Sequence, residues 1–432
     1  MKRVFLAGIA MLCLISAQIF AGGQGQAAPK SETSAAKTEL KLWDQYYRGV
    51  ENDVMEQIVE GFSKANPDLR INRSTKTLDD LKLVLKMSVE SGDGPDLMQL
   101  NQGEADMGAF VKAGLVEDLS KTAQAKKWES AFSAANLKMM GYKGSYYGVA
   151  ATAEVVGFYY NKDLFSKLNL SIPTSFAELE SLLAKIKAAG YVPINFGNLD
   201  AWPGIHVWSA LQHVFTTRPE LDAMMSGKPG KHWAVDANLR ASQKLQEWVS
   251  KGYFTAKYAG IGYDDSVNEF MRGDSALMLT GNWLQGEFSQ NAPFATGFFI
   301  FPAESPKLLK AIGGPAIPFV VSAKSSKKDA AVRFLDYMAS PEAARLWAKN
   351  DMLPAYPVKP TDYMDADPLF LDILRAYDQV IKSGAMGYYI DWITPTFYDT
   401  SSASIQRLMA GELNPAAFVQ ALQTDYETHY QK

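Results

Sequence analysis

The sequence predicts an α/β protein built from two lobes, and three observations support this prediction. The chain has 432 residues, enough for two or three domains at roughly 150 residues per domain. From Glu39 onward, short β-like runs alternate with longer helical ones. A second stretch of this alternation follows the first, without a repeat of fixed period. We therefore expect two lobes, each with a sheet flanked by helices.

The composition excludes several classes of protein. Hydrophobic residues make up 47% of the chain and there is one Cys, which argues against disorder and against a disulfide scaffold. The net charge of −4 argues against nucleic-acid binding, because such proteins gather Lys and Arg on one face. Four His are few for metal sites. The 9 Trp, 20 Tyr and 22 Phe stand out.

The first residues are typical of a secretory signal peptide. Lys2 and Arg3 precede an apolar run at 4–15, and small residues lead to Ala21, where we place the cleavage site. This run is shorter than the roughly 18 apolar residues of a membrane span, although a retained membrane anchor stays the alternative. The residues before Cys13 lack the small side chain that lipidation needs, so we expect no lipid anchor. We expect an exported protein, periplasmic or extracellular.

Residues 22–37 are small and polar, without a periodic apolar face, and this predicts a flexible tether. If Cys13 leaves with the signal peptide, the mature chain has no Cys. The fold must then be stabilised by packing, without disulfides.

The first alternating unit gives strands that end near one another. Strands are expected over 40–43, 69–74 and 97–100. The helices between them start near Val54 and Leu78, where apolar residues recur at helical spacing. In such a parallel unit, ligands bind at the carboxyl ends of the strands.

The second unit follows residue 145. Ser175 and Glu178 form a capping box that opens a helix through Ile186. Other β-like apolar runs predict strands over 146–151, 155–160, 192–196, 276–280, 297–301 and 317–321. Apolar residues at helical spacing predict helices over 330–339, 341–349, 369–381 and 401–430.

Five blocks of sequence carry a family resemblance. They are GPDL (94–97) with VKAGLVEDL (111–119), YKGSYYGV (142–149) with YYNKDLF (159–165) and IPTSFAEL (172–179), GDSALMLTGNW (273–283), AAVRFL (330–335) with MASPEAA (338–344), and MAGELNP (409–415). In this order the blocks resemble the family 1 extracellular solute-binding proteins of sugar ABC importers. The likeness extends over nearly everything from Glu39 to Tyr426.

The resemblance implies a periplasmic-binding-protein fold, in which two lobes close about a hinge over a sugar and present the closed form to a membrane ABC permease. By analogy, the N-terminal lobe takes 38–149 and 296–352, and the C-terminal lobe takes 152–294 and 356–432. We expect a monomer with a carbohydrate ligand, no cofactor, no metal and no catalytic residue.

The aromatic content itself favours a carbohydrate. A pyranose has C–H faces and a rim of hydroxyls, so its site needs flat rings with carboxylates and amides around them. Trp43, Asp44 and Gln45 follow the first strand, where Trp43 could instead end a core strand. Asn101 and Glu104 follow the third strand; Glu104 could accept sugar hydroxyls or cap a helix.

Later candidates lie beyond the first unit. Glu154 lies in the crossing between the lobes and matches a position where the family often has an acidic ligand residue. Asp200 and Trp202 follow a strand, in a loop suited to a stacking ring. Asn282 and Trp283 follow another strand, and the resemblance makes Trp283 the strongest single candidate, with core packing as the alternative.

The last candidates are two glycines and an aromatic cluster. Gly313 and Gly314 would let the backbone approach a ligand closely, or form an ordinary turn. The cluster consists of Tyr389, Asp391 and Trp392, and Tyr398 could line the same wall.

Two other functions stay open. The same fold could bind a non-sugar solute such as a polyol phosphate or a polyamine, although we find no basic cluster at the strand ends to favour the phosphate. A secreted glycoside hydrolase would need two carboxylates about 5 Å apart. There is no G-x-S-x-G elbow, metal-ligand spacing or phosphate-cradling motif. Nothing in the sequence demands catalysis.

Overall fold

The computed structural model describes residues 37–431, apart from 133, 303–304, 306–307, 309–310 and 364. The expected signal peptide, its cleavage site and all of the tether before residue 37 lie outside the described residues. Within the described part, residues from Lys37 onward form one compact unit. No helix in this part is long and apolar enough to cross a membrane.

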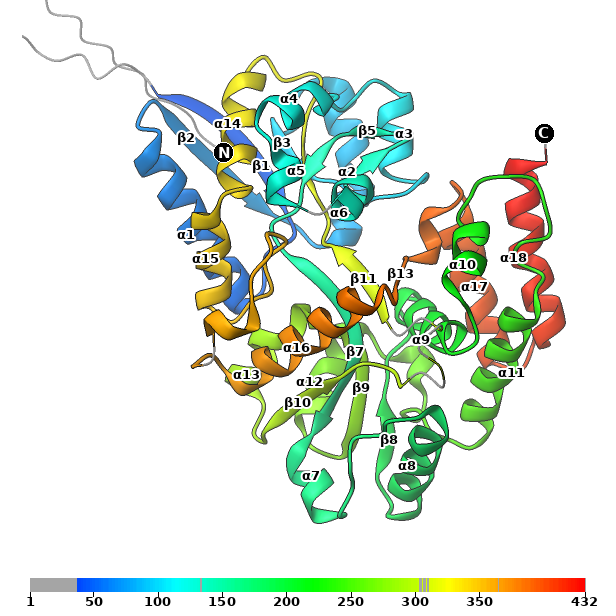
Figure 1. Ribbon diagram of the computed structural model, residues 1–432. Coiled ribbons are helices and arrows are strands. Elements are labelled where there is room, and N and C mark those ends of the chain that lie inside the picture. The colour runs from blue at the N-terminus through cyan, green and yellow to red at the C-terminus, as the bar shows by residue number, and fades with distance from the viewer. Residues whose placement is uncertain are drawn as a thin grey trace, which may run out of the picture. The chain divides into compact units, whose positions relative to one another are not determined.

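The first sheet has five strands in the order β2-β1-β3-β12-β6, of which β1, β2 and β3 are labelled in Figure 1. β1 pairs in parallel with β2 and β3, as the alternation of strands and helices predicts, whereas β12 is antiparallel to both of its neighbours. The strands are β1 (Thr38–Asp44), β2 (Leu69–Thr75), β3 (Leu97–Gln99), β6 (Gly148–Val149) and β12 (Phe319–Val321).

Two helices cross between the parallel strands. α1 (Gly49–Ala65) ends at Asn66 because Pro67 disfavours a helical residue before it. α2 (Leu78–Ser91) begins where the Thr77 side chain accepts the backbone N–H of Asp80, and ends at Gly92, whose φ of 84° suits glycine.

The second sheet has six strands and is built around β7. Its order is β13-β11-β7-β9-β8, with β10 also paired to β7. Only the pairs β8 with β9 and β11 with β13 are parallel. The strands are β7 (Ala153–Asn161), β8 (Val192–Asn195), β9 (Ser275–Gly281), β10 (Thr296–Phe299), β11 (Ala311–Pro315) and β13 (Met386–Gly387).

The strand pairing assigns two segments differently from the expected lobes. Residues 296–352 are predicted to belong to the N-terminal lobe, yet β10 and β11 pair with β7 in the second sheet. β7 is nine residues long, so its amino half can pair with β11 while its carboxyl half pairs with β10. The chain returns to the first sheet at β12. The other lobe boundaries stay a prediction.

Two helical regions differ from the prediction, one near the end of the chain and one that begins at Trp202. The stretch 401–430 forms two helices, α17 (Phe397–Met409) and α18 (Pro415–Tyr430), because Gly411 with a φ of 77° lies between them and Asn414 caps the second. Residues from Trp202 on, expected in a loop, form α9 (Trp202–His213). Its first turn contains Pro203, which fits that position.

The short strands β4 (Gly141–Tyr142) and β5 (Ser145–Tyr146) pair as a hairpin. The remaining helices flank the sheets. They are α3 (Met107–Lys112), α4 (Ser120–Ala125), α5 (Trp128–Ala131), α6 (Ala134–Met139), α7 (Lys162–Lys167), α8 (Phe176–Ala188), α10 (Arg218–Met224), α11 (Asp236–Ser250), α12 (Tyr263–Met271), α13 (Gln285–Asn291), α14 (Lys328–Met338), α15 (Pro341–Lys349), α16 (Pro368–Ser383), and the short turns η1 (Tyr258–Gly260), η2 (Asn282–Leu284), η3 (Pro360–Tyr363) and η4 (Ile390–Trp392).

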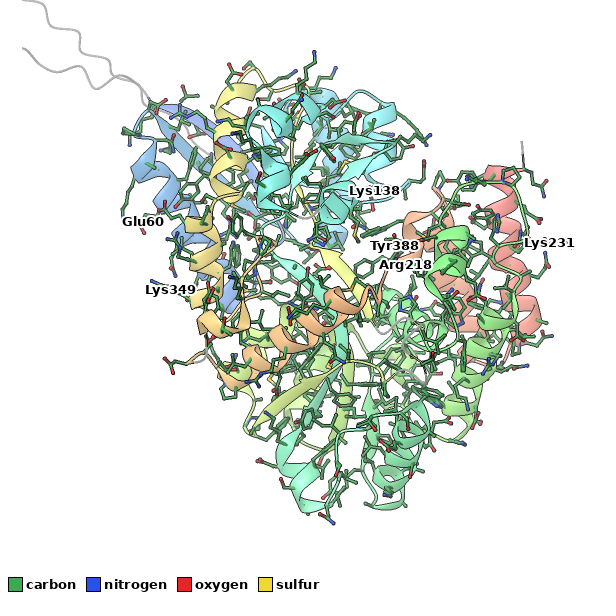
Figure 2. All side chains as sticks on the ribbon, viewed as in Figure 1. Glu60, Lys138, Arg218, Lys231, Lys349 and Tyr388 are labelled. Carbon is green, nitrogen blue, oxygen red and sulfur yellow. The ribbon has the colours of Figure 1, made fainter. Side chains whose placement is uncertain are left out.

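Much of the aromatic content lies in the buried cores of the molecule. Five tryptophans are less than 2% exposed, namely Trp128, Trp208, Trp233, Trp248 and Trp347. Such side chains contribute large apolar areas to folding. Charged side chains such as Glu60, Lys138, Lys231 and Lys349 are exposed to solvent instead (Figure 2). The four tryptophans that remain are therefore the ones to consider for binding.

Candidate functional site

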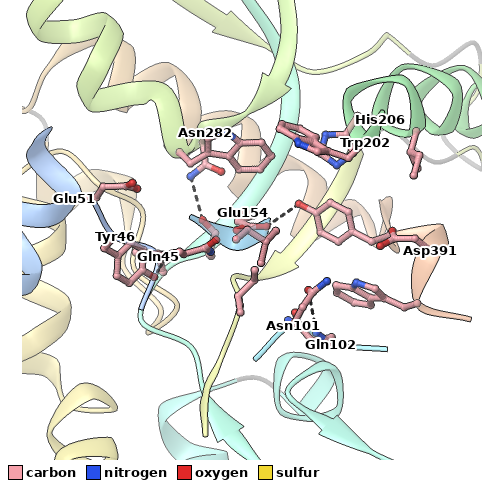
Figure 3. Close-up of a pocket in the computed structure, with 18 of the residues that line it drawn as sticks. Gln45, Tyr46, Glu51, Asn101, Gln102, Glu154, Trp202, His206, Asn282 and Asp391 are labelled. Carbon is pink, nitrogen blue, oxygen red and sulfur yellow. Dashed lines mark hydrogen bonds between the residues drawn. The ribbon is translucent and has the colours of Figure 1, made fainter. Parts of the chain in front are cut away.

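One pocket collects residues from both sheets and their connections, with a cavity of about 180 Å³ (Figure 3). Its first side is formed by residues that follow β1 and β3 and by α2. Its second side is formed by the start of β7, by α9 and by η2, η4 and α17. The lining residues are Gln45, Tyr46, Arg48, Glu51, Leu78, Lys82, Asn101, Gln102, Thr152, Ala153, Glu154, Trp202, Ile205, His206, Asn282, Trp283, Ile317, Met352, Leu353, Tyr389, Asp391, Trp392 and Tyr398.

Ten of the sixteen residues predicted from the sequence line this pocket. They are Gln45, Asn101, Glu154, Trp202, Asn282, Trp283, Tyr389, Asp391, Trp392 and Tyr398. These residues come from segments up to 353 positions apart, so the strand-end argument and the resemblance selected one region of the molecule.

Asp44 is one of the six that do not line the pocket. Its side chain is fully buried, and its two carboxylate oxygens accept hydrogen bonds from the Arg73 guanidinium at 2.7 and 2.8 Å. Asp44 Oδ1 also accepts the backbone N–H of Tyr46 at 2.9 Å. Asp44 therefore shapes the loop that presents Gln45 and Tyr46, instead of touching a ligand.

Trp43 and Glu104 point elsewhere as well. Side chains alternate along a strand, so Trp43 faces away from its neighbour Asp44 and lies under the Lys76 ammonium, 4.7 Å from the ring centre. The Glu104 carboxylate accepts hydrogen bonds from the Lys112 ammonium and from the Tyr142 hydroxyl, which is 2.8 Å away. Both are held by neighbours on their own side of the molecule.

The last three residues, Asp200, Gly313 and Gly314, contact other parts of the protein. Asp200 accepts the backbone N–H of Tyr263 at 2.6 Å, at the start of α12. Gly313 and Gly314 lie in β11, where a Cβ would meet the Glu154 carbonyl oxygen at 2.1 Å or the Met139 side chain at 2.4 Å. The expected close backbone approach exists, but the partner is protein and not a ligand.

Aromatic rings form one wall of the pocket. Trp202 and Trp283 meet edge to face with ring centres 6.2 Å apart, and His206 lies 5.1 Å from Trp202 and 5.9 Å from Trp283. Tyr389 continues the wall, 5.5 Å from His206 and 5.1 Å from Trp392. Such flat, partly exposed rings suit the C–H faces of a sugar or a cation.

The Trp283 ring is held in place from behind. Its Nε1–H donates to the Tyr263 hydroxyl at 2.6 Å, and that hydroxyl lies 2.8 Å from the Thr280 hydroxyl. The ring covers Gly281, where a Cβ would fall 1.8 Å from it. Glycine at 281 is thus required for the ring to lie flat against the end of β9.

Several amides in the pocket already have protein partners. Asn282 Oδ1 accepts the backbone N–H of Val155 at 2.8 Å, and its Nδ2–H donates to the Ala153 carbonyl at 3.1 Å. Gln102 Nε2 donates to the carbonyls of Pro315 and Ala316, both at 3.2 Å. These side chains fix the two pocket walls relative to the backbone of β7 and β11.

The titratable groups of the pocket are perturbed by burial. Burial raises the pKa of Glu51 to about 8, with Arg48 opposing, and that of Glu154 to about 7, with the Tyr389 hydrogen bond opposing. Burial also raises the pKa of Asp391 to about 6, with Lys82 opposing. It lowers the pKa of His206 to about 3, so this imidazole is neutral at neutral pH. The described residues contain no cluster that could hold a metal ion.

The sequence argument missed several lining residues. Arg48 and Glu51 lie at the start of α1. The expectation that ligand residues follow the end of a strand, which selected residues 43–45, reaches them when it is extended by one helical turn. His206 follows Trp202 by four residues, the spacing that puts two side chains on one helix face, but this required recognising α9. Lys82 on α2 had no local signal.

Residues 48–345 match the sequence model of a family described as bacterial extracellular solute-binding protein. Among curated proteins, the multiple sugar-binding protein of Streptococcus mutans is 25% identical over 333 residues, 76% of this chain and 78% of that protein. The sn-glycerol-3-phosphate-binding periplasmic protein UgpB of Shigella flexneri is 27% identical over 346 residues, 74% of each.

Solved structures share the fold. A chitin oligosaccharide binding protein matches with a TM-score of 0.79 at 22% identity, over 92% of this chain and 100% of that one. The protein RafE in complex with raffinose matches with a TM-score of 0.72 at 21% identity, over 91% of this chain and 100% of that one. The predicted two-lobed fold of sheets flanked by helices is thereby confirmed.

Proposed function

Because the chain belongs to the family of bacterial extracellular solute-binding proteins, as the resemblance predicted, we propose that it captures a carbohydrate in this pocket and delivers it to the permease of an ABC importer. The observation that carries the proposal is the aromatic wall of Trp202, Trp283, Tyr389 and Trp392 beside polar side chains from the other wall. Rings and hydrogen-bonding groups are what the faces and rim of a sugar require.

The ten predicted residues that line the pocket are proposed to contact the sugar or hold the groups that do. Gln45 and Asn101 approach from the first side, and Trp283 and Tyr389 from the second. Each stacking or hydrogen-bonding contact is worth about 1 kcal/mol, so several together fit micromolar affinity, about −8 kcal/mol.

The pocket's construction also supports a mechanism of closure. Its lining comes from elements around both sheets, so a sugar in it is gripped from two sides. A ligand shifts an equilibrium between open and closed forms only through its different affinity for the two. A sugar that contacts both sides stabilises the closed form, which the permease then recognises.

The chain is proposed to act as a monomer after export. The family is extracellular, and the N-terminal sequence fits a signal peptide removed after Ala21, a tether at 22–37 and no lipid anchor. Mass spectrometry of the exported protein tests the proposed processing: a mature N-terminus at Gly22 without a lipid is expected. A product that keeps residues 1–21, or carries an acyl chain, would contradict it.

A second ligand class has support from one relative. UgpB is named for binding sn-glycerol 3-phosphate, and Arg48 and Lys82 line the pocket of this chain. Arg48, however, already pairs with Asp264 at 2.7 Å, and three carboxyl groups line the same pocket. At neutral pH Asp391 and part of Glu154 are ionised and would repel a phosphate, so the sugar is favoured.

The experiment is a thermal-shift screen of the purified exported protein against mono- and oligosaccharides, glycerol 3-phosphate and spermidine, followed by calorimetry of any hit. A raised melting temperature with a sugar is expected, since a ligand of the folded form stabilises it. Stabilisation by glycerol 3-phosphate or spermidine alone would contradict the proposal. We propose that the protein binds without turnover, and release of aryl groups from aryl glycosides would contradict this.

A further inference from the structure

The carboxyl groups of the pocket differ in whether a cation lies near them. Three carboxyl side chains line it, those of Glu51, Glu154 and Asp391, and none forms an ion pair with any described residue. Glu51 and Asp391 each have a cation nearby: the charge of Arg48 lowers the pKa of Glu51, and the charge of Lys82 lowers the pKa of Asp391. Among the residues that the structure describes, no cation acts on Glu154.

Glu154 stands at the centre of the pocket in Figure 3, at the amino end of β7. One carboxylate oxygen accepts the Tyr389 hydroxyl at 2.7 Å. The nearby Asn282 amide uses its oxygen and one of its two N–H donors on the backbone of β7, and it is neutral, so it supplies no counter-charge. A carboxylate withdrawn from water without a counter-charge is costly, so Glu154 must either take up a proton or receive a cation from the ligand.

His206 supplies an independent observation. Its side chain is 8% exposed, lines the pocket and has an Nδ1 without a hydrogen-bond partner in the described part of the chain. Burial keeps the imidazole neutral, so it offers no positive charge to Glu154. The wall formed by His206, Trp283 and Tyr389 lies beside a carboxylate that has no cationic partner in the described part of the chain. That combination attracts an ammonium group.

We propose that the sugar bound by this pocket is an amino sugar, whose ammonium group pairs with Glu154 while its C–H faces lie against the aromatic wall. This inference rests on the proposed function and specifies its ligand class. An ammonium group has three N–H donors, enough to bind Glu154 and a second acceptor in the pocket. A hydroxyl in the same place would donate one hydrogen bond and leave the charge unbalanced.

The test compares matched sugars by calorimetry at pH 7. Glucosamine, galactosamine and the β-1,4-linked dimer of glucosamine are measured against the same sugars carrying a hydroxyl or an acetamido group instead of the amine. At least one amino sugar is expected to bind about tenfold or more tightly than its neutral counterparts. If every neutral or N-acetylated sugar binds as tightly as its amino form, the inference is wrong and the proposed function stands.

Glu154→Gln removes the charge while keeping the shape and the hydrogen-bond acceptor for Tyr389. It is expected to lower amino-sugar affinity about tenfold and to change neutral-sugar affinity about threefold at most. Glu104→Gln is the matched control, because Glu104 is a half-buried carboxylate outside the pocket that pairs with Lys112. The control should keep the amino-sugar preference. A preference that survives in Glu154→Gln overturns the assignment to Glu154.

Spermidine and glycerol 3-phosphate complete the set of probes. If only spermidine binds, the carboxylates serve a polyamine, and both this inference and the sugar function are wrong. If only glycerol 3-phosphate binds, the pocket takes an anion, with the same consequence. Failure to bind any amino sugar overturns the inference in each case.

Discussion

The Arg48 guanidinium donates a hydrogen bond to Asp264 Oδ1 at 2.7 Å, joining the loop after β1 to the first turn of α12, 216 positions along the chain. Two further contacts cross between elements of the two sheets. The Lys82 ammonium lies 4.5 Å above the Tyr398 ring, and the backbone N–H of Glu104 donates to the Trp392 carbonyl at 2.8 Å. Under the proposed closure, these contacts stabilise the closed form in addition to those that a ligand would make.

Asp264→Asn should weaken sugar binding without touching the pocket, because Asp264 does not line it. An exposed ion pair contributes about 1 kcal/mol at most, so we expect the dissociation constant to rise about two- to fivefold. The cause is that the closed form loses a contact which the ligand must replace. Calorimetry at about 50 mM and 500 mM salt should show the difference shrink as salt screens the pair.

Asp68→Asn is the matched control for this change. Asp68 forms a similarly exposed ion pair with Arg333 at 2.8 Å, but Asp68 lies in the turn before β2 and Arg333 in α14, both beside the first sheet. Its loss should leave the dissociation constant unchanged. If both variants bind more weakly to the same extent, the effect comes from surface charge and not from closure.

Gly103→Ala tests the crossing contact between Glu104 and Trp392. Gly103 has a φ of 90°, and a Cβ there would lie 2.5 Å from the Trp392 Cα, so the two sides cannot come this close with alanine in place. We expect at least a tenfold loss of sugar affinity and a larger radius of gyration with sugar present, measured by small-angle scattering. Gly114→Ala carries similar backbone strain, with a φ of 66° and nothing within 4 Å. If both variants lose stability equally and neither loses affinity, closure does not depend on this contact.

The sequence anticipated the scaffold of the site better than its chemistry. Strand ends are readable from apolar runs, so the residue pattern alone was enough to place Gln45 and Asn101 at a common edge. Which side chain at such an edge faces the ligand depends on alternation and on partners elsewhere. Asp44 illustrates this, since Arg73, 29 positions away, takes up its carboxylate.

The aromatic residues show the same division. Abundance alone did not distinguish Trp208, which is buried in the core, from Trp283, which lies in the pocket wall. The family resemblance, and not composition, singled out Trp283. Glu51 and His206 escaped because their roles depend on helix starts that the apolar pattern did not mark, and on burial that appears only once both walls are assembled.

Trp283→Ala should separate binding from folding. The ring is partly exposed in the pocket and held by Tyr263, so we expect at least a tenfold loss of sugar affinity with a small loss of stability. Trp208→Ala is the opposite case, because Trp208 is fully buried and donates to Ser242 at 3.0 Å. That variant should lose about 3–5 kcal/mol of stability, and its folded fraction should bind normally. Loss of stability without loss of affinity in Trp283→Ala would reassign the ring to the core.

Glu51 should make the free protein less stable as the pH rises. Burial raises its pKa to about 8 in the folded state, whereas the unfolded chain has the ordinary value of about 4.3. Between these two values the folded state binds more protons than the unfolded state, so the free energy of unfolding falls as pH increases through this window. Glu51→Gln removes that penalty and should be more stable than the parent at pH 8, by at most about 5 kcal/mol, with little difference near pH 4.

Urea unfolding at pH 5 and pH 8 measures this effect. Glu154 and Asp391 have raised pKa values too, so the slope in Glu51→Gln should be reduced and not abolished. Glu60→Gln, on the exposed face of the same helix, is the control: Lys64 lowers the Glu60 pKa, and its removal should leave the fall in stability between pH 5 and 8 intact. If Glu51→Gln keeps the parent's pH dependence, Glu51 is solvated in the free protein, which would mean that the pocket stands open to water until a ligand closes it.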